Sequence, residues 1–213
     1  MADWLGIYGA SGCGRGLMPL ARGVPRDRRV FIDDGASCTS ANGYRVMRWE
    51  EFLALEGDKA ACVAIADGKV RARLVDRIEQ AGVALAGVRA DTVTIMDEVE
   101  IGAGACLSPF VTLTNNIVIG RAFHANLYSY VEHDCVIDDF VTFAPRVSCN
   151  GNVHIGDGAY IGAGALIRQG RPEAPLRIGA GAVVGMGAVV TRSVAPGETV
   201  VGNPARPMEA RRG

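Results

Sequence analysis

The residues best suited to acid–base chemistry lie together in the stretch 126–134. Asn126 opens this stretch, and Glu132, His133 and Asp134 close it. An imidazole accepts a proton readily near neutral pH, and acidic neighbours can fix its tautomer and raise its basicity. The sequence therefore predicts a general base at His133, flanked by carboxylates.

This stretch belongs to a six-residue repeat, which determines where His133 points. Every sixth residue from Ile95 to Ile167 is apolar, and a second column two residues earlier is apolar or small apart from Ser129. A hexapeptide period is typical of a parallel β-helix, a prism in which three hexads make one coil. His133 follows the inward-facing Val131 by two residues, so its side chain is predicted on the outer side of the coil.

The register of the repeat breaks once, after Ile167. Five extra residues precede Ile178 and predict a loop extruded at a coil corner within 168–177, a kind of loop that often borders a site. The chain then ends in a rigid exposed turn at 201–206, which carries a basic residue. Glycines that follow the first column are expected to ease the corner turns. They are Gly102, Gly120, Gly156, Gly162, Gly179 and Gly185.

The first 90 residues follow an α/β pattern instead. The predicted strands are 5–8, 30–32, 61–66 and 83–88, and the predicted helical segments are 17–21, 49–55 and 70–78. Strands that alternate with helices imply a small parallel sheet. The sequence therefore divides into an α/β domain at 1–90 and an all-β parallel β-helix domain at 91–213.

A glycine-rich turn follows the first predicted strand, in the segment 9–14. Backbone N–H groups and a helix N-terminus at such a turn suit a phosphate. Asp33 and Asp34 close the second strand and can accept hydrogen bonds from a ribose or a base. The spacing is GxxGxG rather than the GxGxxG of dinucleotide enzymes. A turn that only lets strand and helix pack closely is therefore the alternative.

Composition narrows the possible partners. The net charge is −1 and the isoelectric point is about 6.3, which gives no sign of a nucleic-acid partner. No apolar run approaches the roughly 20 residues that cross a bilayer. Residues 1–15 lack the basic start and sustained apolar stretch of an export signal. We expect a cytoplasmic protein without a membrane partner.

The remaining histidines and the cysteines have structural interpretations. His154 is expected on the coil surface, whereas His124 stays open. The six cysteines include no CxxC pair and no metal-ligand spacing, so no metal site is expected. Four of them are predicted to be small buried hydrophobic residues in a reducing compartment. They are Cys62, Cys106, Cys135 and Cys149.

Nearly the whole chain resembles the bacterial nucleotide-sugar acetyltransferases of the PglD/NeuD type. In that family a small Rossmann-like domain precedes a left-handed β-helix of hexapeptide repeats. The matching segments are IYGASG at 7–12, FIDD at 31–34, AIA at 64–66, VEHDCVI at 131–137, CNGNV at 149–153 and GNPAR at 202–206.

The resemblance implies a homotrimer that uses acetyl-CoA as co-substrate. The coenzyme would lie in the groove between adjacent prisms, and the N-terminal domain would hold a nucleotide amino sugar. His133 would be the catalytic base and Asp134 its orienting carboxylate. The implied substrate contacts are Gly9, Ser11, Gly12, Cys13, Gly14, Asp33, Asp34, Lys69, Asn126 and Glu132. The implied coenzyme contacts are Asn150, Gly151, Gly162, Gly185, Asn203, Pro204 and Arg206.

Two positions depart from the family pattern. Cys13 stands where the family usually has His, and Asp134 stands where it usually has Glu. A thiol cannot replace an imidazole as a proton acceptor at neutral pH unless its pKa is strongly lowered. The substrate pocket is therefore expected to differ. The shorter Asp134 is expected to lengthen or shift the contact with His133.

The expected reaction is direct N-acetylation of a UDP- or dTDP-linked 4-amino-4,6-dideoxy sugar, with His133 as general base. O-acetylation of a sugar such as sialic acid is the alternative within the same family. A β-helix scaffold that binds ligand without turnover is a third possibility. Acylation of Cys135 is a rival path, but its place in an inward column argues for burial.

Overall fold

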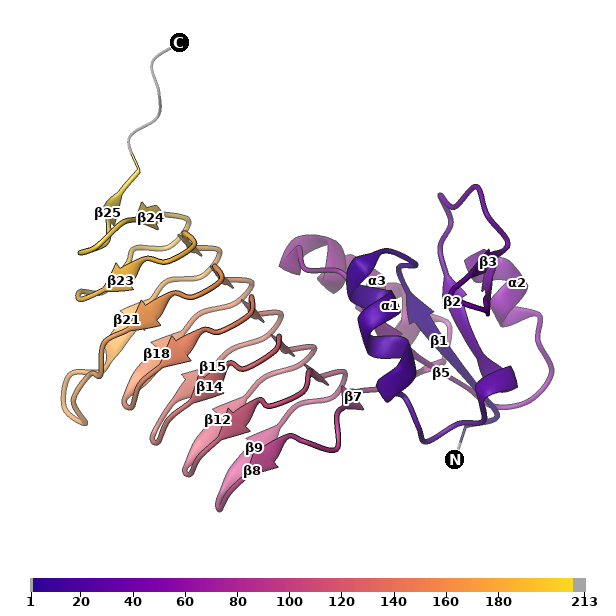
Figure 1. The fold of residues 1–213 in the computed structure, drawn as a ribbon, viewed down its shortest axis with the longest axis horizontal. Coiled ribbons are helices and arrows are strands. Elements are labelled where there is room, and N and C mark those ends of the chain that lie inside the picture. The colour runs from indigo at the N-terminus through magenta and orange to yellow at the C-terminus, as the bar shows by residue number, and fades with distance from the viewer. Residues whose placement is uncertain (1, 209–213) are drawn as a thin grey trace, which may run out of the picture.

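A six-stranded sheet and a stack of β-helix coils make up residues 2–208, which the computed structural model describes (Figure 1). The sheet has the order β3-β4-β2-β1-β5-β6, and all its pairs are parallel except β3 with β4. This confirms the parallel sheet predicted from the alternating pattern. Its strands are β1 (Trp4–Tyr8), β2 (Arg29–Ile32), β3 (Ser40–Ala41), β4 (Tyr44–Met47), β5 (Lys59–Val63) and β6 (Ala84–Leu85).

The β3–β4 hairpin was not among the predicted elements. Its turn consists of Asn42 and Gly43, and both have positive φ, at 49° and 75°. A two-residue hairpin turn of type I′ needs positive φ at both central positions, which is why Asn-Gly is a strong hairpin signal. The hairpin adds one antiparallel strand at the sheet edge beyond β4.

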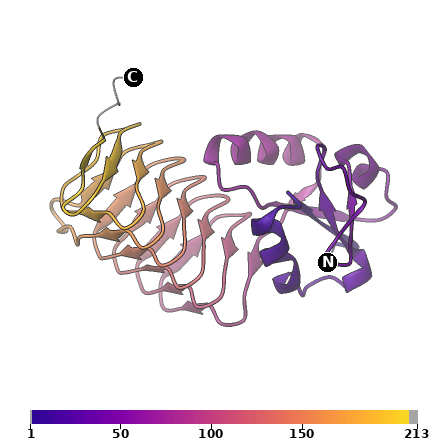
Figure 2. The ribbon, with the colours of Figure 1, turned by 45° about the horizontal axis from the view of Figure 1, so that its top comes forward.

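Helices cover both faces of this sheet (Figure 2). They are α1 (Gly12–Leu17), α2 (Trp49–Leu53) and α3 (Gly68–Gln80), with short 3₁₀ turns at Met18–Leu20 and Arg26–Arg28. Alternate residues of β1 divide between the faces: Ile7 packs with Leu17 on one face, and Tyr8 packs with Ile78 on the other. No helix within residues 2–208 is both long and apolar enough to cross a bilayer.

The β-helix has three sheet faces, all built from parallel strands apart from the last hairpin. The first face has β7 (Val88–Arg89), β10 (Cys106–Leu107), β13 (His124–Ala125), β16 (Thr142–Phe143), β19 (Tyr160–Ile161), β22 (Val183–Val184), β24 (Thr199–Val201) and β25 (Arg206–Pro207). The second has β8 (Thr94–Ile95), β11 (Thr112–Leu113), β14 (Tyr130–Val131), β17 (Ser148–Cys149), β20 (Leu166–Ile167) and β23 (Val189–Val190). The third has β9 (Val99–Ile101), β12 (Ile117–Ile119), β15 (Val136–Ile137), β18 (Val153–Ile155) and β21 (Leu176–Ile178).

Strand pairing confirms that three hexads make one coil. Leu113 pairs with Val131 and Val131 with Cys149, so neighbouring coils are eighteen residues apart. The step lengthens by five between Ile155 and Ile178, as the inserted loop predicts. β7 already pairs with β10, although it precedes the expected boundary between 1–90 and 91–213. The last five residues of the second segment, 209–213, lie outside the described part.

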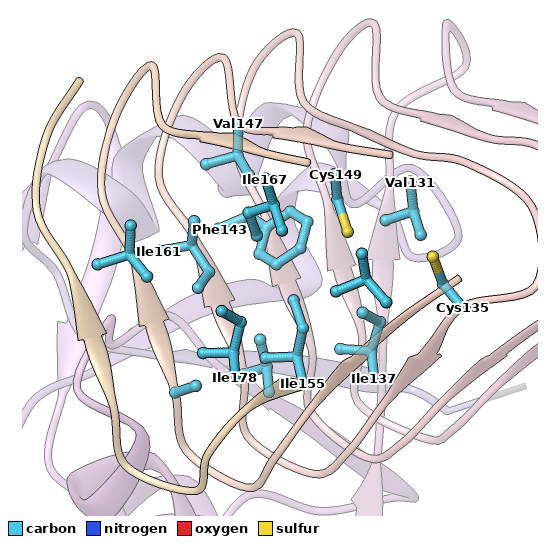
Figure 3. Packing of buried hydrophobic residues seen from close by; sticks show 14 of the residues in the cluster. Val131, Cys135, Ile137, Phe143, Val147, Cys149, Ile155, Ile161, Ile167 and Ile178 are labelled. Atoms are coloured by element: carbon cyan, nitrogen blue, oxygen red, sulfur yellow. The ribbon is translucent and has the colours of Figure 1, made fainter. Parts of the chain in front are cut away.

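The first apolar column fills the interior of the coils (Figure 3). Its members from Leu107 to Ile167 are buried, and Ile95 and Ile101 in the first coil are partly buried. Ser129, the polar residue of the second column, is also buried. Its hydroxyl donates to Ala144 O at 3.0 Å, which satisfies the hydroxyl inside an apolar interior.

The corner turns depend on a different position from the one expected. At successive corners, the residue with φ near +60° lies two places after the position where glycine was expected. This residue has that conformation whether it is itself glycine or another residue type. The non-glycine residues in this conformation are Glu98, Phe110, Asn116, Ala122, Tyr128, Asp134, Phe140, Arg146 and Asn152. Gly102 and Gly162 have no such φ. A Cβ there would lie 2.6 Å from backbone atoms of the next coil, so close coil stacking requires these glycines.

A buried arginine joins the two parts of the chain. Arg71 on α3 is fully buried, and its guanidinium donates only to backbone carbonyls. Burial lowers its pKa to about 10, so the group stays charged at neutral pH. Thr142 of β16 adds a hydrogen bond to Ala66 O at 2.8 Å. The acceptors of Arg71 are the carbonyl oxygens of Ile65, Ala66, Ala122, Phe140 and Val141.

Replacing Arg71 with Met should destabilise the protein by at least about 3 kcal/mol, because each buried acceptor left without a partner costs about 1–3 kcal/mol. Chemical denaturation followed by circular dichroism measures the loss. Arg73→Met is the matched control, since Arg73 is exposed on the same helix, and it should change stability by less than about 0.5 kcal/mol. Equal unfolding midpoints for the two variants would contradict the role of Arg71.

Candidate active site

His133 and Asp134 lie at a coil corner between β14 and β15, as the repeat predicts. His133 Nδ1 is 2.7 Å from Asp134 Oδ2, and the two side chains are 39% and 47% exposed. Asn116, at the same corner of the preceding coil, donates to Asp134 Oδ1 at 3.3 Å. The hydrogen bond with His133 is the main cause that lowers the pKa of Asp134. The shorter carboxylate thus still reaches the imidazole, and it does so as an anion.

Gly151 lies against the ring of His133 from the next coil. A Cβ at position 151 would lie 2.5 Å from His133 Cε1 and 2.6 Å from Nε2. Any larger residue at position 151 would therefore displace the imidazole. The family resemblance implies a coenzyme contact for Gly151. The structure adds a more direct function, which is to leave space for the ring of the proposed base.

The other polar residues near this corner differ in whether their side chains already have hydrogen-bond partners. Glu132 is partly buried, and its carboxylate has no hydrogen bond among the described residues. The Asn150 amide is engaged: Oδ1 accepts from the Tyr130 hydroxyl, and Nδ2 donates to Ile167 O, both at 2.9 Å. Glu132 can therefore meet a ligand without losing an internal partner, whereas Asn150 cannot.

The glycine-rich turn after β1 is held by backbone contacts and by Asp33. Gly9 has φ +105°, a conformation that L side chains rarely adopt. A Cβ on Gly14 would lie 1.9 Å from Gly9 O, so this glycine lets α1 pack on the turn. Asp33 Oδ2 accepts from Ala10 N at 3.2 Å. Ser11 is exposed and makes no side-chain cap to α1.

A hollow of about 230 Å³ brings part of the predicted substrate set together. Gly12 and Cys13 line it from the N-terminal domain, and His124 and Asn126 line it from the β-helix. A Cβ at Gly12 would meet nothing within 4 Å, so internal packing does not explain that glycine. Burial raises the pKa of Cys13 to about 11, so its thiol stays neutral. Among the described residues His133 does not line this hollow.

The surroundings of two of the three histidines, His124 and His154, favour a role other than that of a general base. His124, which the sequence left open, is buried, and its Nε2 has no partner among the described residues. His154 lies on the outward side of β18, as expected. Partial burial and the nearby Arg177 lower its pKa. His133 is therefore the histidine that combines an exposed ring with a carboxylate partner.

Asp34 serves the fold in this structure. Its carboxylate accepts from Tyr8 Oη at 2.5 Å, Arg77 at 2.6 Å and Trp49 N at 2.8 Å. Burial works to raise its pKa, but these hydrogen bonds outweigh burial and leave the pKa lowered. The contact with a nucleotide expected of Asp34 would have to compete with all three. Asp33 is better placed for a ligand, because it lines a separate hollow of about 210 Å³ together with Arg48.

Lys69 lies apart from the glycine-rich turn. It is exposed near the start of α3 and lines a hollow of about 410 Å³ with Tyr160 and Val183 of the β-helix. That hollow contains none of the glycines at 9–14. The structure therefore does not bring Lys69 to the predicted phosphate turn.

The predicted coenzyme contacts near the C-terminus are spread along the coils. Gly185 is required by packing, because a Cβ there would lie 2.7 Å from Val201 Cγ1. Asn203 and Pro204 form an exposed turn, and Arg206 follows in β25 with its side chain exposed. Their contact with coenzyme stays a prediction. No group of three potential ligand side chains among residues 2–208 is arranged to hold a metal ion.

The four cysteines predicted to be buried are buried, which confirms that expectation. The thiol of Cys135 contacts Asn150 O at 3.3 Å and His133 O at 3.6 Å, inside the coil. A buried thiol that donates to carbonyl oxygens is poorly placed to attack a thioester. The geometry thus disfavours an acyl-cysteine path.

Thiol titration of the native protein should reveal one fast-reacting cysteine, Cys38, which is exposed. Cys13 should react more slowly, because its pKa is raised to about 11 and its thiolate fraction is small. The other four should react only in denaturant, which is the control for complete labelling. A fast-reacting thiol that persists in a Cys38→Ser variant would contradict this assignment.

Comparison with known proteins identifies the family of the chain. The sequence is 48% identical over 211 residues to the GDP-perosamine N-acetyltransferase of Escherichia coli O157:H7, and the match spans 96% of each chain. The structure of WeeI from Acinetobacter baumannii AYE matches with a TM-score of 0.94 at 54% identity, over 97% of this chain and 100% of that one.

A second solved structure carries a ligand. The acetyltransferase domain of PglB from Neisseria gonorrhoeae FA1090, in complex with acetyl coenzyme A, matches with a TM-score of 0.88 at 27% identity, over 98% of this chain and 100% of that one. No protein-family model matches the sequence. With nearly half of its residues identical to a relative along almost the full length of both, the chain belongs to the hexapeptide-repeat nucleotide-sugar acetyltransferases, which are acyl-CoA-dependent enzymes.

Proposed function

We propose that this protein transfers the acetyl group of acetyl-CoA to the amine of a GDP-linked 4-amino-4,6-dideoxy sugar of the perosamine kind. Two observations together carry the proposal. The chain is 48% identical to a GDP-perosamine N-acetyltransferase over 96% of both sequences, and the His133–Asp134 pair lies at an exposed coil corner. GDP here replaces the UDP or dTDP carrier expected from the sequence, because the relative acts on a GDP sugar.

The nucleotide sugar would be held by the N-terminal domain. The parallel strands follow each other in the order β4-β2-β1-β5-β6, so the strand order reverses beside β1, as in a doubly wound, Rossmann-like sheet. Ligands of such sheets bind beyond the strand ends at this reversal. Gly9–Gly14 follows β1 there and would meet the diphosphate, while Asp33 would meet the nucleoside.

His133 would act as the general base. Its Nδ1 faces Asp134, and if this nitrogen carries the proton, Nε2 keeps a free lone pair. The amine attacks the thioester carbon and Nε2 takes a proton from the attacking nitrogen. As the carbon–sulfur bond breaks, the imidazolium would return this proton to the leaving sulfur, so coenzyme A departs as a thiol. A base in this position typically contributes roughly 10²–10⁴-fold. Holding both substrates in one groove supplies the larger share.

The assembly would be a homotrimer of left-handed coils in the cytoplasm. In one chain, the hollow lined by Gly12 and Asn126 and the corner that carries His133 are separate places. A groove between adjacent prisms would bring these two kinds of surface together from different copies. In such an assembly, one chain alone is not expected to hold the corner of His133 and the residues Gly12 and Asn126 in one hollow. Among its described residues it has no such hollow.

A thiol-release assay with acetyl-CoA and a panel of GDP-, UDP- and dTDP-linked amino sugars tests the function. Turnover should be highest with a GDP-linked 4-amino-4,6-dideoxy sugar, and His133→Ala should lower kcat by roughly 10²-fold or more with normal folding. Sialic acid serves as the hydroxyl acceptor. Turnover only with a hydroxyl sugar would favour O-acetylation, and an unchanged kcat in His133→Ala would remove His133 from the chemistry.

Gly151→Ala should lower kcat by at least about tenfold, because the new methyl group would displace the imidazole of His133. Coenzyme affinity, measured by calorimetry, and the melting temperature should change little. Gly23→Ala is the control, since a Cβ at Gly23 meets nothing within 4 Å and the residue lies outside the proposed site. If Gly151→Ala weakens coenzyme binding and leaves kcat intact, the family-implied coenzyme contact is its main role instead.

A further inference from the structure

His124 on β13 is a buried imidazole that the proposed reaction, as described so far, does not use. The residue is 2% exposed, and its Nε2 has no hydrogen-bond partner among residues 2–208. Burying a polar atom without a partner is costly, because water has been removed from it and nothing replaces the lost hydrogen bond. Such an atom therefore needs a reason, and a bound molecule that supplies the partner is one.

The two residues that flank His124 on the first face of the β-helix do not supply this partner. Strand pairing places Cys106 on one side of His124 and Thr142 on the other. The Thr142 hydroxyl already donates to Ala66 O at 2.8 Å. A thiol is a weak hydrogen-bonding group, and Cys106 Sγ lies 3.8 Å from Gly104 O. Neither neighbour thus gives the imidazole a strong hydrogen bond.

His124 lines the hollow of about 230 Å³ to which both parts of the chain contribute. Pockets for drug-sized ligands usually measure roughly 300–1,000 Å³, so this one suits a single ring rather than a whole nucleotide sugar. Asn126 adds a second polar group: its Nδ2 donates to Phe143 O at 2.7 Å, and its Oδ1 has no hydrogen bond among the described residues. Three leucines contribute apolar wall, namely Leu17, Leu20 and Leu127.

The hollow adjoins the glycine-rich turn that is proposed to meet the diphosphate. Gly12 and Cys13 belong to that turn and also line the hollow. A nucleotide sugar carries its sugar on the outer phosphate, so a diphosphate held at 9–14 would direct the sugar ring into this hollow. Gly12 leaves the way open, because a Cβ there would meet nothing within 4 Å. Polar groups beside leucines suit a deoxy sugar, which has both hydroxyls and a methyl group.

We propose that His124 binds a hydroxyl of the acceptor sugar and selects sugars that carry a hydroxyl next to the reacting amine. The inference rests on the proposed function and adds a specificity-determining residue to it. In a 4-amino-4,6-dideoxy sugar of the perosamine kind, this hydroxyl is the one on C3. A neutral imidazole can donate to a hydroxyl or accept from it. A site built for a hydroxyl discriminates against an acceptor without one, because its own polar group is then left unpaired.

Thiol-release kinetics with a GDP-linked 4-amino-4,6-dideoxy sugar and its 3-deoxy analogue test the proposal. The wild type should have a kcat/KM roughly ten- to hundredfold lower for the analogue. His124→Phe keeps a ring but removes both nitrogens, so it should treat the two sugars nearly alike. His124→Gln keeps a hydrogen-bonding side chain and should retain part of the discrimination.

Thr142→Val is the matched control, because Thr142 lies beside His124 on the same face but does not line the hollow. It loses the hydrogen bond to Ala66, so its melting temperature should fall while its discrimination between the two sugars stays that of the wild type. Calorimetry with GDP, which lacks the amino sugar, should give unchanged affinity in both His124 variants. Thermal melts identify the variants that fold.

Equal kcat/KM values of the wild type for the two sugars would overturn the proposal, whether or not the His124 variants fold. Full discrimination in a folded His124→Phe variant would also overturn it, because another group would then recognise the hydroxyl. Weaker GDP binding in folded His124 variants would assign His124 to the domain junction instead. A failure of the proposed function is distinct, because the wild type would then release no thiol with either sugar. Calorimetry with the same two sugars would still measure the discrimination in binding.

Discussion

The candidate site depends on one constraint, which is that the chain returns to the same place on the prism every eighteen residues. Parallel pairing between coils imposes this step, because the inward columns must stack on one another. Gly151 is one coil beyond His133, and Asn116 is one coil before Asp134. The groups that shape and hold the proposed base are therefore its neighbours along the coil axis, although they are distant in sequence.

The six-residue columns and the eighteen-residue step also show what could be predicted from the sequence and what could not. The hexad columns determine which side chains point into the coil. The burial of Cys135, the outward ring of His133 and the five-residue insertion were therefore all predictable. The eighteen-residue step would also have placed Gly151 beside His133, had it been applied to the corners. The partners of Asp34 were not accessible in this way. Arg77 approaches Asp34 from a helix forty-three residues further along the chain, and no local pattern encodes that contact.

The junction between the sheet and the coils has its own requirement. The outward residues of β10, β13 and β16 are buried there, unlike the exposed Tyr160 further along the same face. A charged side chain that has no carboxylate partner is costly to bury unless all its hydrogen-bond donors have acceptors. Arg71 meets that condition with carbonyls from both sides, which ties α3 and the segment after β5 to a defined part of the prism. The hollow lined by Cys13 and Asn126 lies at this junction, because residues from both parts of the chain line it.

Function in such a coil is confined to the corners by the packing of its interior. An inward residue contacts the coils before and after it, so a polar substitution there would leave buried groups unpaired. Corner positions are freer, because side chains such as those of His133 and Asp134 reach solvent there, although coil stacking still requires glycine at positions such as 102 and 162. Along one prism edge the corners read Glu-His-Asp at 132–134, Asn-Gly-Asn at 150–152 and Arg-Gln-Gly at 168–170, while the apolar column between them continues unbroken. One edge can thus place a base and the space for its ring at successive heights, while the apolar interior beside them stays the same.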